Sequence, residues 1–219
     1  ALSRCRQFEL FATTLGAAMV GGGTGGSGGG APNGGNGQGL GGALFIQGDN
    51  TITFSPPFGQ TVTVASSIAD QAGSGGNGSV IINGAFNGGT VLLTAPGTYT
   101  GGTTIEIGTF ELGSGGSVVS NVTFADLRPG ETLRLDTGAN QLGASIAGFS
   151  AGDSIDLAVL GFNAAISAIW LETGPNAGTL SLIENGATVA ALNLTGQYTS
   201  AEFSFGSDGH SGTAIGLRN

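Results

Sequence analysis

Four consecutive residues, Asp208-Gly209-His210-Ser211, bring together the side-chain types of a hydrolase triad. A working triad needs the imidazole to bridge the nucleophile and the orienting acid at hydrogen-bond distances, and closeness in sequence does not provide that geometry. A polar turn that contains glycine explains the same residues. We therefore expect a turn at these positions, with no catalytic role.

Two pairs of acidic residues are the other candidates for catalysis. Glycosidases and polysaccharide lyases need carboxylates that converge, in some cases with Arg, Lys or a bound cation. Asp153 lies close to Asp156 in sequence, and Glu106 lies close to Glu111. Asp153 precedes a predicted strand and would cap a turn, while the other three alternate with apolar residues, as on a solvated strand face. The sequence thus predicts no catalytic residues and no enzyme.

The single cysteine and the single histidine exclude other chemistry. Cys5 and His210 cannot fill the four positions of a Cys/His zinc site, and one cysteine forms no internal disulfide. Arg4 and Arg6 flank Cys5 and would lower the pKa of its thiol, but no second partner is visible. We assign no metal and no cofactor.

Three threonine pairs could form a surface of a different kind. Stacked outward threonines make regular ladders of methyls and hydroxyls, and such ladders in other β-solenoids bind ice or crystalline glycan. The pairs are Thr51/Thr53, Thr61/Thr63 and Thr98/Thr100. Because they are few and irregularly spaced, we interpret them as the ordinary preference of threonine for strands.

The amino-acid composition indicates a folded chain and excludes several classes of protein. The 219 residues include 45 glycines but only 9% charged residues, against roughly a quarter in an ordinary domain, while 39% are hydrophobic. This chain should fold. Its formal charge is -9 and it has no lysine, so no basic stripe is available for nucleic acid. No run reaches the ~18 apolar residues of a membrane-spanning helix.

The sequence divides into three regions that differ in composition and residue pattern. Residues 1–20 place Phe8, Phe11, Leu15 and Met19 at near-helical spacing, which predicts a short N-terminal helix or cap; the remnant of an export signal is the alternative. Residues 21–42 have glycine at 14 of 22 positions and form a linker or an ordered extended segment. Residues 43–219 carry the main fold.

That main region consists of short runs rich in Thr, Val, Ile and Leu, closed by Gly, Asn or Pro, as in strands. The predicted strands are 43–47, 51–54, 61–65, 79–82, 90–94, 103–107, 110–112, 118–124, 132–136, 154–159, 179–183, 188–194 and 202–205. No helix is predicted among them. The chain is therefore all-β.

Alternation within the strands favours a β-solenoid. Ile105 and Ile107 would point inward, followed after a corner by Phe110 and Leu112. Each strand thus offers only two or three inward side chains, which stacked coils can pool into one core. We predict a right-handed parallel β-helix of about 20 residues per coil, on the order of eight coils in all. A sandwich or mixed β fold is the alternative.

Residues 93–113 read L-T-A-P-G-T-Y-T-G-G-T-T-I-E-I-G-T-F-E-L-G. This segment resembles the passenger-associated transport repeat of bacterial autotransporters. The shared pattern is T-Y-T-G-G-T-T-I, a G-T corner and an apolar-x-Leu-Gly close. Gly101-Gly102 permits a corner with positive φ, and Tyr99 can lie against the next coil. A shorter segment, 146–157, is similar to the I-x-x-F-x-x-G-D-x-I-D-L phrase of large exported bacterial proteins. Only one good repeat copy is present, and no barrel strands of a translocator follow residues 214–219, so we expect either that this part was removed or that the chain is a free-standing relative or a fragment.

The resemblance implies a secreted β-helix at a bacterial cell surface, with a structural or adhesive function. An uncapped last coil would expose backbone and apolar side chains, so end-to-end self-association into a filament or layer is expected. A surface glycan is the other candidate partner. The alternatives are a passive passenger fragment of a longer adhesin and a carbohydrate-active β-helix enzyme.

Overall fold

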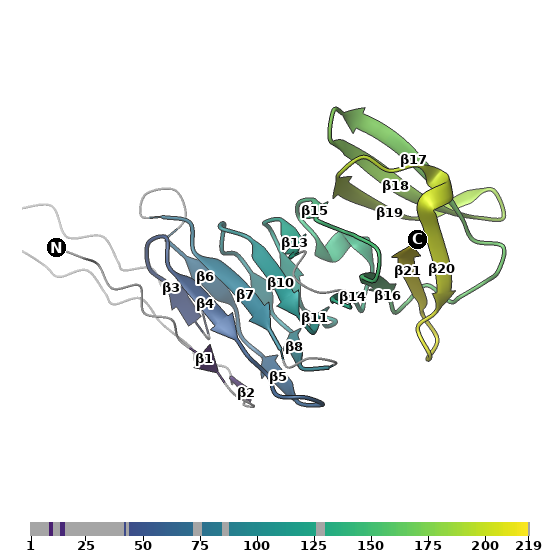
Figure 1. Cartoon of the computed structure of the whole chain (residues 1–219). Coiled ribbons are helices and arrows are strands. Elements are labelled where there is room, and N and C mark those ends of the chain that lie inside the picture. The colour runs from purple at the N-terminus through teal and green to yellow at the C-terminus, as the bar shows by residue number, and fades with distance from the viewer. Residues whose placement is uncertain are drawn as a thin grey trace, which may run out of the picture.

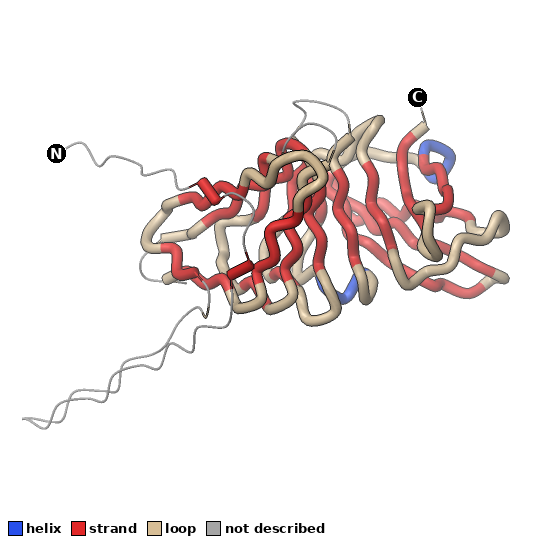
Figure 2. Tube along the Cα trace, turned by 90° about the horizontal axis from the view of Figure 1, so that it is seen from below, coloured by secondary structure: helices blue, strands red, loops and turns tan. Residues whose placement is uncertain are grey.

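The computed structural model describes residues 9–10, 14–15, 42, 44–71, 76–84, 88–125 and 130–218. These residues form an elongated β-solenoid, which confirms the predicted fold; it has about four turns, and its strands lie side by side along the body (Figures 1 and 2). The fold consists of three sheets. No described helix is long and apolar enough to cross a membrane.

Neighbouring strands within each sheet are mostly far apart along the chain. In spatial order, sheet A contains β1 (Glu9–Leu10), β4 (Thr51–Phe54), β7 (Ser79–Asn83), β10 (Thr103–Ile107), β13 (Val122–Phe124), β15 (Ile146–Ala147), β19 (Ala187–Thr195), β18 (Ala177–Glu184) and β17 (Ser167–Gly174). Sheet B contains β2 (Thr14–Leu15), β5 (Thr61–Val64), β8 (Thr90–Leu93), β11 (Thr109–Leu112), β14 (Thr132–Leu135), β16 (Ser154–Leu157), β21 (Thr213–Leu217) and β20 (Phe203–Ser207). Sheet C contains β12 (Ser117–Val118), β9 (Pro96–Gly97), β6 (Ile68–Asp70) and β3 (Leu44–Ile46). Two short 3₁₀ helices complete the described elements, η1 (Ala139–Gln141) and η2 (Ser200–Glu202).

Each coil passes through sheets C, A and B in that order. The complete coils are β3-β4-β5, β6-β7-β8, β9-β10-β11 and β12-β13-β14, and a fifth contributes β15 and β16. The expected number of eight is wrong. Strands of sheet C begin at Leu44, Ile68, Pro96 and Ser117, so successive coils span 24, 28 and 21 residues, and the strands after Leu157 add no further coil.

The winding ends at Leu157, after which β19 joins β15 in parallel and the other neighbouring strands run antiparallel. β17, β18 and β19 form a meander that extends sheet A, and β20 and β21 form a hairpin that extends sheet B. Asn185 and Gly186 both have positive φ at the turn from β18 to β19. Asn-Gly between two alternating runs is the strongest short signal for such a hairpin, and the strand pattern predicted from sequence did not make use of it.

Each predicted strand overlaps an observed one. The run 118–124 is two strands, however, because the chain turns from sheet C to sheet A between β12 and β13. At the described residues of 1–20, where the sequence predicts a short helix or cap, β1 pairs with β4 and β2 pairs with β5, so these residues are strands. The remainder of 1–20, and the Gly-rich segment 21–42 apart from Gly42, lie outside the described residues.

In-register stacking of apolar side chains forms the core. In sheet A, Phe54, Ile82, Ile105 and Phe124 are aligned on successive strands and are buried. Full burial of one such side chain stabilises the fold by about 1.5–3 kcal/mol. Ile107 differs from the expectation: it is half-buried, because the pairing of β10 with β7 shifts between Ile105 and Ile107.

The buried side-chain amide of Gln141 forms hydrogen bonds to the backbone at one corner of the coils. The Nε2 atom of Gln141 lies 2.7–2.9 Å from the carbonyl oxygens of Leu112, Gly113 and Gly116, and its Oε1 accepts a hydrogen bond of 2.8 Å from Thr137 N. The side chain thereby adds donors to three carbonyl groups at a bend, of which Leu112 O also accepts from Asp136 N and Gly113 O from Gly116 N.

The corner at Gly101-Gly102 confirms its predicted geometry. Gly102 has φ +92°, and Tyr99, close before it, is fully buried with its hydroxyl 2.5 Å from Thr103 Oγ1. A Cβ on Gly101 would lie 2.6 Å from the carbonyl oxygens of Asn77 and Gly78 in the preceding coil. Neighbouring coils therefore approach too closely at this corner for any side chain.

Substituting Gly101→Ala should lower the free energy of unfolding by about 1–3 kcal/mol, because backbone must shift to admit the methyl group. Gly174→Ala is the matched control, since a Cβ there has nothing within 4 Å. Urea unfolding of both variants measures the difference. Equal stability of the two would show that the coils are not packed as described.

Candidate functional site

The outer face of sheet B carries a row of hydroxyl side chains. Its members occupy the same position on consecutive strands and alternate with buried apolar residues; they are Thr61, Thr90, Thr109, Thr132 and Ser154. We call them the hydroxyl row. Paired strands lie about 4.8 Å apart, so the hydroxyls recur at that interval. Of this row, only Thr61 was among the threonine pairs singled out from the sequence.

A second outward row lies two residues further along the same strands. It consists of Thr63, Leu92, Glu111, Arg134 and Asp156, again paired in register. The last three place charged groups of opposite sign on neighbouring strands. Electrostatic contacts are therefore concentrated where the solenoid meets the C-terminal hairpin.

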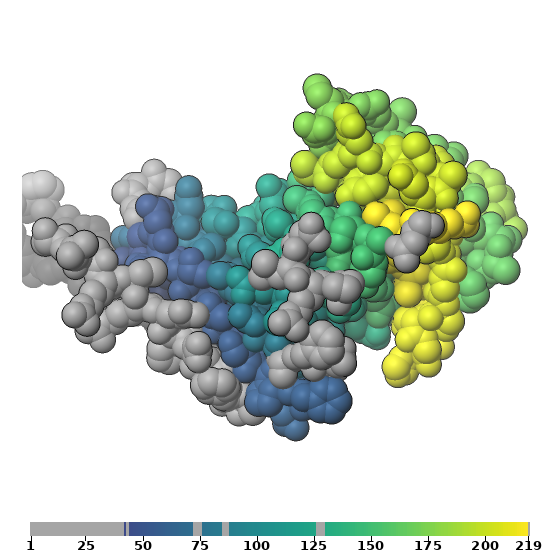
Figure 3. All heavy atoms as spheres, in the orientation of Figure 1, coloured from purple at the N-terminus to yellow at the C-terminus, as the bar shows by residue number. Residues whose placement is uncertain are grey.

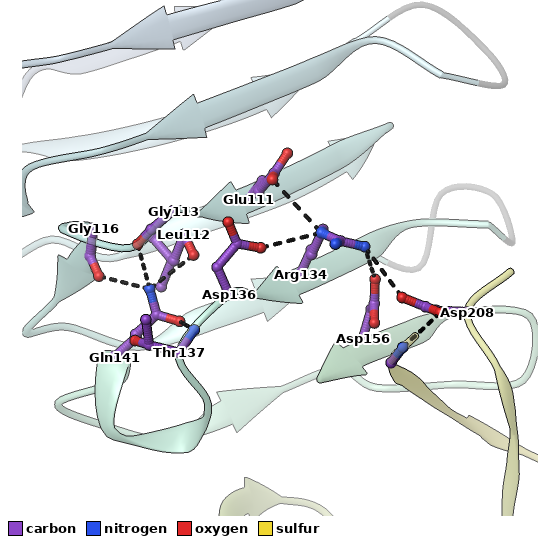
Figure 4. Close-up of polar contacts among 11 residues, drawn as sticks. Glu111, Leu112, Gly113, Gly116, Arg134, Asp136, Thr137, Gln141, Asp156 and Asp208 are labelled. Atoms are coloured by element: carbon purple, nitrogen blue, oxygen red, sulfur yellow. Dashed lines mark hydrogen bonds and ion pairs between the residues drawn. The ribbon is translucent and has the colours of Figure 1, made fainter. Parts of the chain in front are cut away.

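Arg134 lies among four carboxylates, which together with it form what we call the Arg134 cluster (Figure 4). Its Nε is 3.6 Å from Glu111 and 3.2 Å from Asp136, and its Nη1 is 2.5 Å from Asp156 and 3.5 Å from Asp208. One guanidinium thus faces four carboxylates, and the cluster carries an excess of negative charge.

Asp208 reaches the cluster from the connection between β20 and β21. Its Oδ1 accepts hydrogen bonds from the backbone N–H groups of His210 (2.8 Å) and Gly212 (2.9 Å), while its Oδ2 faces Arg134. Residues 208–211 therefore have the hydrogen bonds of a turn. The Asp208 side chain also ties the hairpin to the solenoid.

The acid pairs suggested by sequence are not pairs in space. Asp153 Oδ2 accepts hydrogen bonds from the backbone N and the hydroxyl of Ser150, as a turn cap does, and Glu106 accepts one from Asn83. The expectation of a solvated face is wrong for Asp156, which is 6% exposed. Pairing of β16 with β21 and the contact with Arg134 enclose it.

The protonation behaviour of the cluster reflects this enclosure. Burial raises the pKa of Asp156 and of Glu111 above the ordinary carboxyl value, and Arg134 offsets only part of that rise. Partial burial lowers the pKa of Arg134, but Asp156, Glu111 and Asp136 raise it by more, so the guanidinium stays charged. For Asp208, the backbone hydrogen bonds and Arg134 outweigh desolvation and lower the pKa.

A hollow lies beside the cluster, at the C-terminal end of the hydroxyl row. It has a volume of about 290 Å³ and is lined by Thr132, Ser154, Asp156, Ser207, Asp208 and Ala214. Figure 3 shows the C-terminal hairpin, in yellow, projecting beside the last coils. Within the described residues, no group of three or more His, Cys, Asp or Glu is placed to hold a metal ion.

Neither a family model, nor a curated protein, nor a solved structure matches this chain. The resemblance of 93–113 to the autotransporter repeat stays a prediction. In the structure, this segment includes β9, β10 and β11, which make up one coil.

The sequence did contain a signal for both rows. Strands β5, β8, β11, β14 and β16 read TVTV, TVLL, TFEL, TLRL and SIDL. Aligned as equivalent strands of successive coils, they place hydroxyls in the first column and Glu111, Arg134 and Asp156 in the third. Asp208 has no such signal, because it comes from a hairpin that the strand pattern does not align.

The raised pKa of Asp156 predicts a pH effect of definite sign. A carboxyl with a higher pKa in the folded than in the unfolded chain binds its proton more readily when folded, so acidification stabilises the fold through it. As the pH falls from about 6 to about 4, the wild type should gain stability relative to Asp156→Asn. Asp208, with the opposite shift, is present in both proteins, so the comparison reports Asp156 together with its electrostatic effect on Asp208 and Glu111.

Urea unfolding across this pH range measures the difference. A wild type that instead loses stability relative to the variant would mean that the ion pair with Arg134 outweighs the burial of Asp156.

Proposed function

We propose that this chain is an extracellular β-solenoid of a bacterial surface, with a structural or adhesive function and no catalytic step. The observation that carries the proposal is the hydroxyl row, which gives sheet B a regular outward face. The autotransporter-like segment 93–113 supports the extracellular location.

The chemistry of the hydroxyl row suits a polysaccharide. Each Thr or Ser hydroxyl both donates and accepts hydrogen bonds, as sugar hydroxyls do. A rigid row at strand spacing loses little conformational freedom when a regular polymer lies along it. A surface glycan is therefore the ligand class that we propose for this face.

Self-association is the second part of the proposal. β17 is the last strand of sheet A and exposes Ile169 (53%) and Leu171 (63%) on one face. Trp170, on the other face, packs against Tyr198. Long edge strands with exposed apolar residues favour association with another copy. The backbone N–H of Trp170 already donates to Ser200 Oγ, so contact through the apolar face is favoured over edge pairing.

A carbohydrate-active enzyme is the competing candidate, because the Arg134 cluster gathers four carboxylates beside a hollow. The ion pairs with Arg134 favour a binding role instead. A glycosidase needs two carboxylates that flank the scissile bond, whereas here all four carboxylates face the guanidinium of Arg134.

Removing two neighbouring hydroxyls should weaken adhesion. Thr109→Val with Thr132→Val keeps strand preference but deletes two hydrogen-bonding groups, so retention on insoluble polysaccharide particles should fall by about tenfold or more. The matched control is Thr104→Val with Thr123→Val, an aligned outward pair on sheet A. A pull-down across a panel of neutral, acidic and amine-bearing polysaccharides measures retention.

Equal retention of both double variants, or no retention of the wild type on any polysaccharide, would refute the adhesive proposal. Steady release of soluble sugar products, abolished by Asp156→Asn, would establish the enzyme in its place.

For self-association, Leu171→Lys should shift assemblies toward the monomer in sedimentation velocity runs at rising concentration. Val119→Lys, at another exposed apolar residue, should leave them unchanged. A wild type that stays monomeric throughout contradicts this part of the proposal.

A further inference from the structure

The hollow beside the Arg134 cluster combines negative charge with an acceptor that lacks a partner. Asp156 Oδ2 contacts Arg134, but Asp156 Oδ1 is buried and forms no hydrogen bond. The side chain is 9% exposed and lines the hollow. A buried acceptor without a donor is unfavourable, so a donor that reaches Asp156 from the hollow relieves this penalty.

The other groups that line the hollow indicate the chemistry of the ligand that would supply this donor. Thr132, Ser154 and Ser207 contribute hydroxyls, and Asp208 contributes a second carboxylate whose side chain is 3% exposed. These groups suit a ligand with both a positive charge and several hydroxyls. A bare metal ion fits poorly, because the Arg134 guanidinium lies between the carboxylates and no metal-ligating group of three is found in the described part of the chain.

The hollow is also continuous with the hydroxyl row, since Thr132 and Ser154 belong to both. A polymer along sheet B would therefore place one of its units in the hollow. The volume of about 290 Å³ lies at the lower end of the usual range for small-molecule sites, which suits a single sugar unit.

We propose that this hollow binds the ammonium group of an amino sugar within a polysaccharide, with Asp156 and Asp208 as its counter-charges. The inference rests on the proposed adhesive function and narrows its ligand to glycans with free amines. Asp156 Oδ1 accepts a charge-assisted hydrogen bond from the ammonium, and the neighbouring hydroxyls bind the sugar oxygens.

The test compares soluble glucosamine oligomers with their fully N-acetylated counterparts by isothermal titration calorimetry on the full chain. Acetylation removes the charge and leaves the sugar backbone in place. The glucosamine oligomers should bind at least about tenfold more tightly, and their advantage should shrink with added salt.

Two variants locate the site. Asp156→Asn should lower the affinity for glucosamine oligomers about tenfold or more and leave that for the acetylated oligomers unchanged. Glu172→Gln makes the same charge change at an exposed residue of β17 and should have no effect. Ala214→Leu fills the hollow without altering charge and should also abolish the preference, so the test stands even where Asp156→Asn fails to fold.

Equal binding of both oligomers, or an amine preference that survives in Asp156→Asn or Ala214→Leu, overturns the inference. Equal binding that still depends on Thr109 and Thr132 leaves the adhesive function intact, whereas no binding to any polysaccharide removes both.

Discussion

In-register stacking of parallel coils is the constraint on which the rest of this structure depends. Each strand position lies directly beside the same position of the next coil, at the spacing of a hydrogen-bonded sheet. A residue type that recurs in equivalent strands therefore becomes a continuous row. Inward, this gives the aligned column of Phe54, Ile82, Ile105 and Phe124. Outward, it gives the hydroxyl row.

The same constraint explains why charge is concentrated in one place. With few charged residues in the chain, most outward positions are neutral, yet Glu111, Arg134 and Asp156 occupy one column of three adjacent strands. Opposite charges on neighbouring strands attract, and enclosure by the C-terminal hairpin strengthens that attraction while opposing ionisation of the acids. Asp208 then joins the hairpin to the coils. The Arg134 cluster thus forms where the parallel coils end and the C-terminal hairpin packs against them.

The sequence predicts what is local and repeated. Strand positions follow from composition and spacing within single coils, and the repeat-like segment 93–113 indicates the corner at Gly101-Gly102, where Gly102 has positive φ. The number of coils does not follow in this way, because corner lengths vary and because the coils give way after Leu157 to a meander and a hairpin built from similar strands. The antiparallel strands at the C-terminal end were not predicted, although Asn185-Gly186 is a typical hairpin turn. Asp208 contacts Arg134 across 74 residues, and no local pattern encodes such a contact.

The central claim is that the outer face of sheet B is the binding surface, and methyl-resolved NMR with labelled threonine tests it most directly. On titration with glucosamine oligomers, the account predicts shifts at Thr90, Thr109 and Thr132, with the methyls of Thr104 and Thr123 on sheet A unmoved. Shifts confined to sheet A, or spread evenly over both faces, would contradict it.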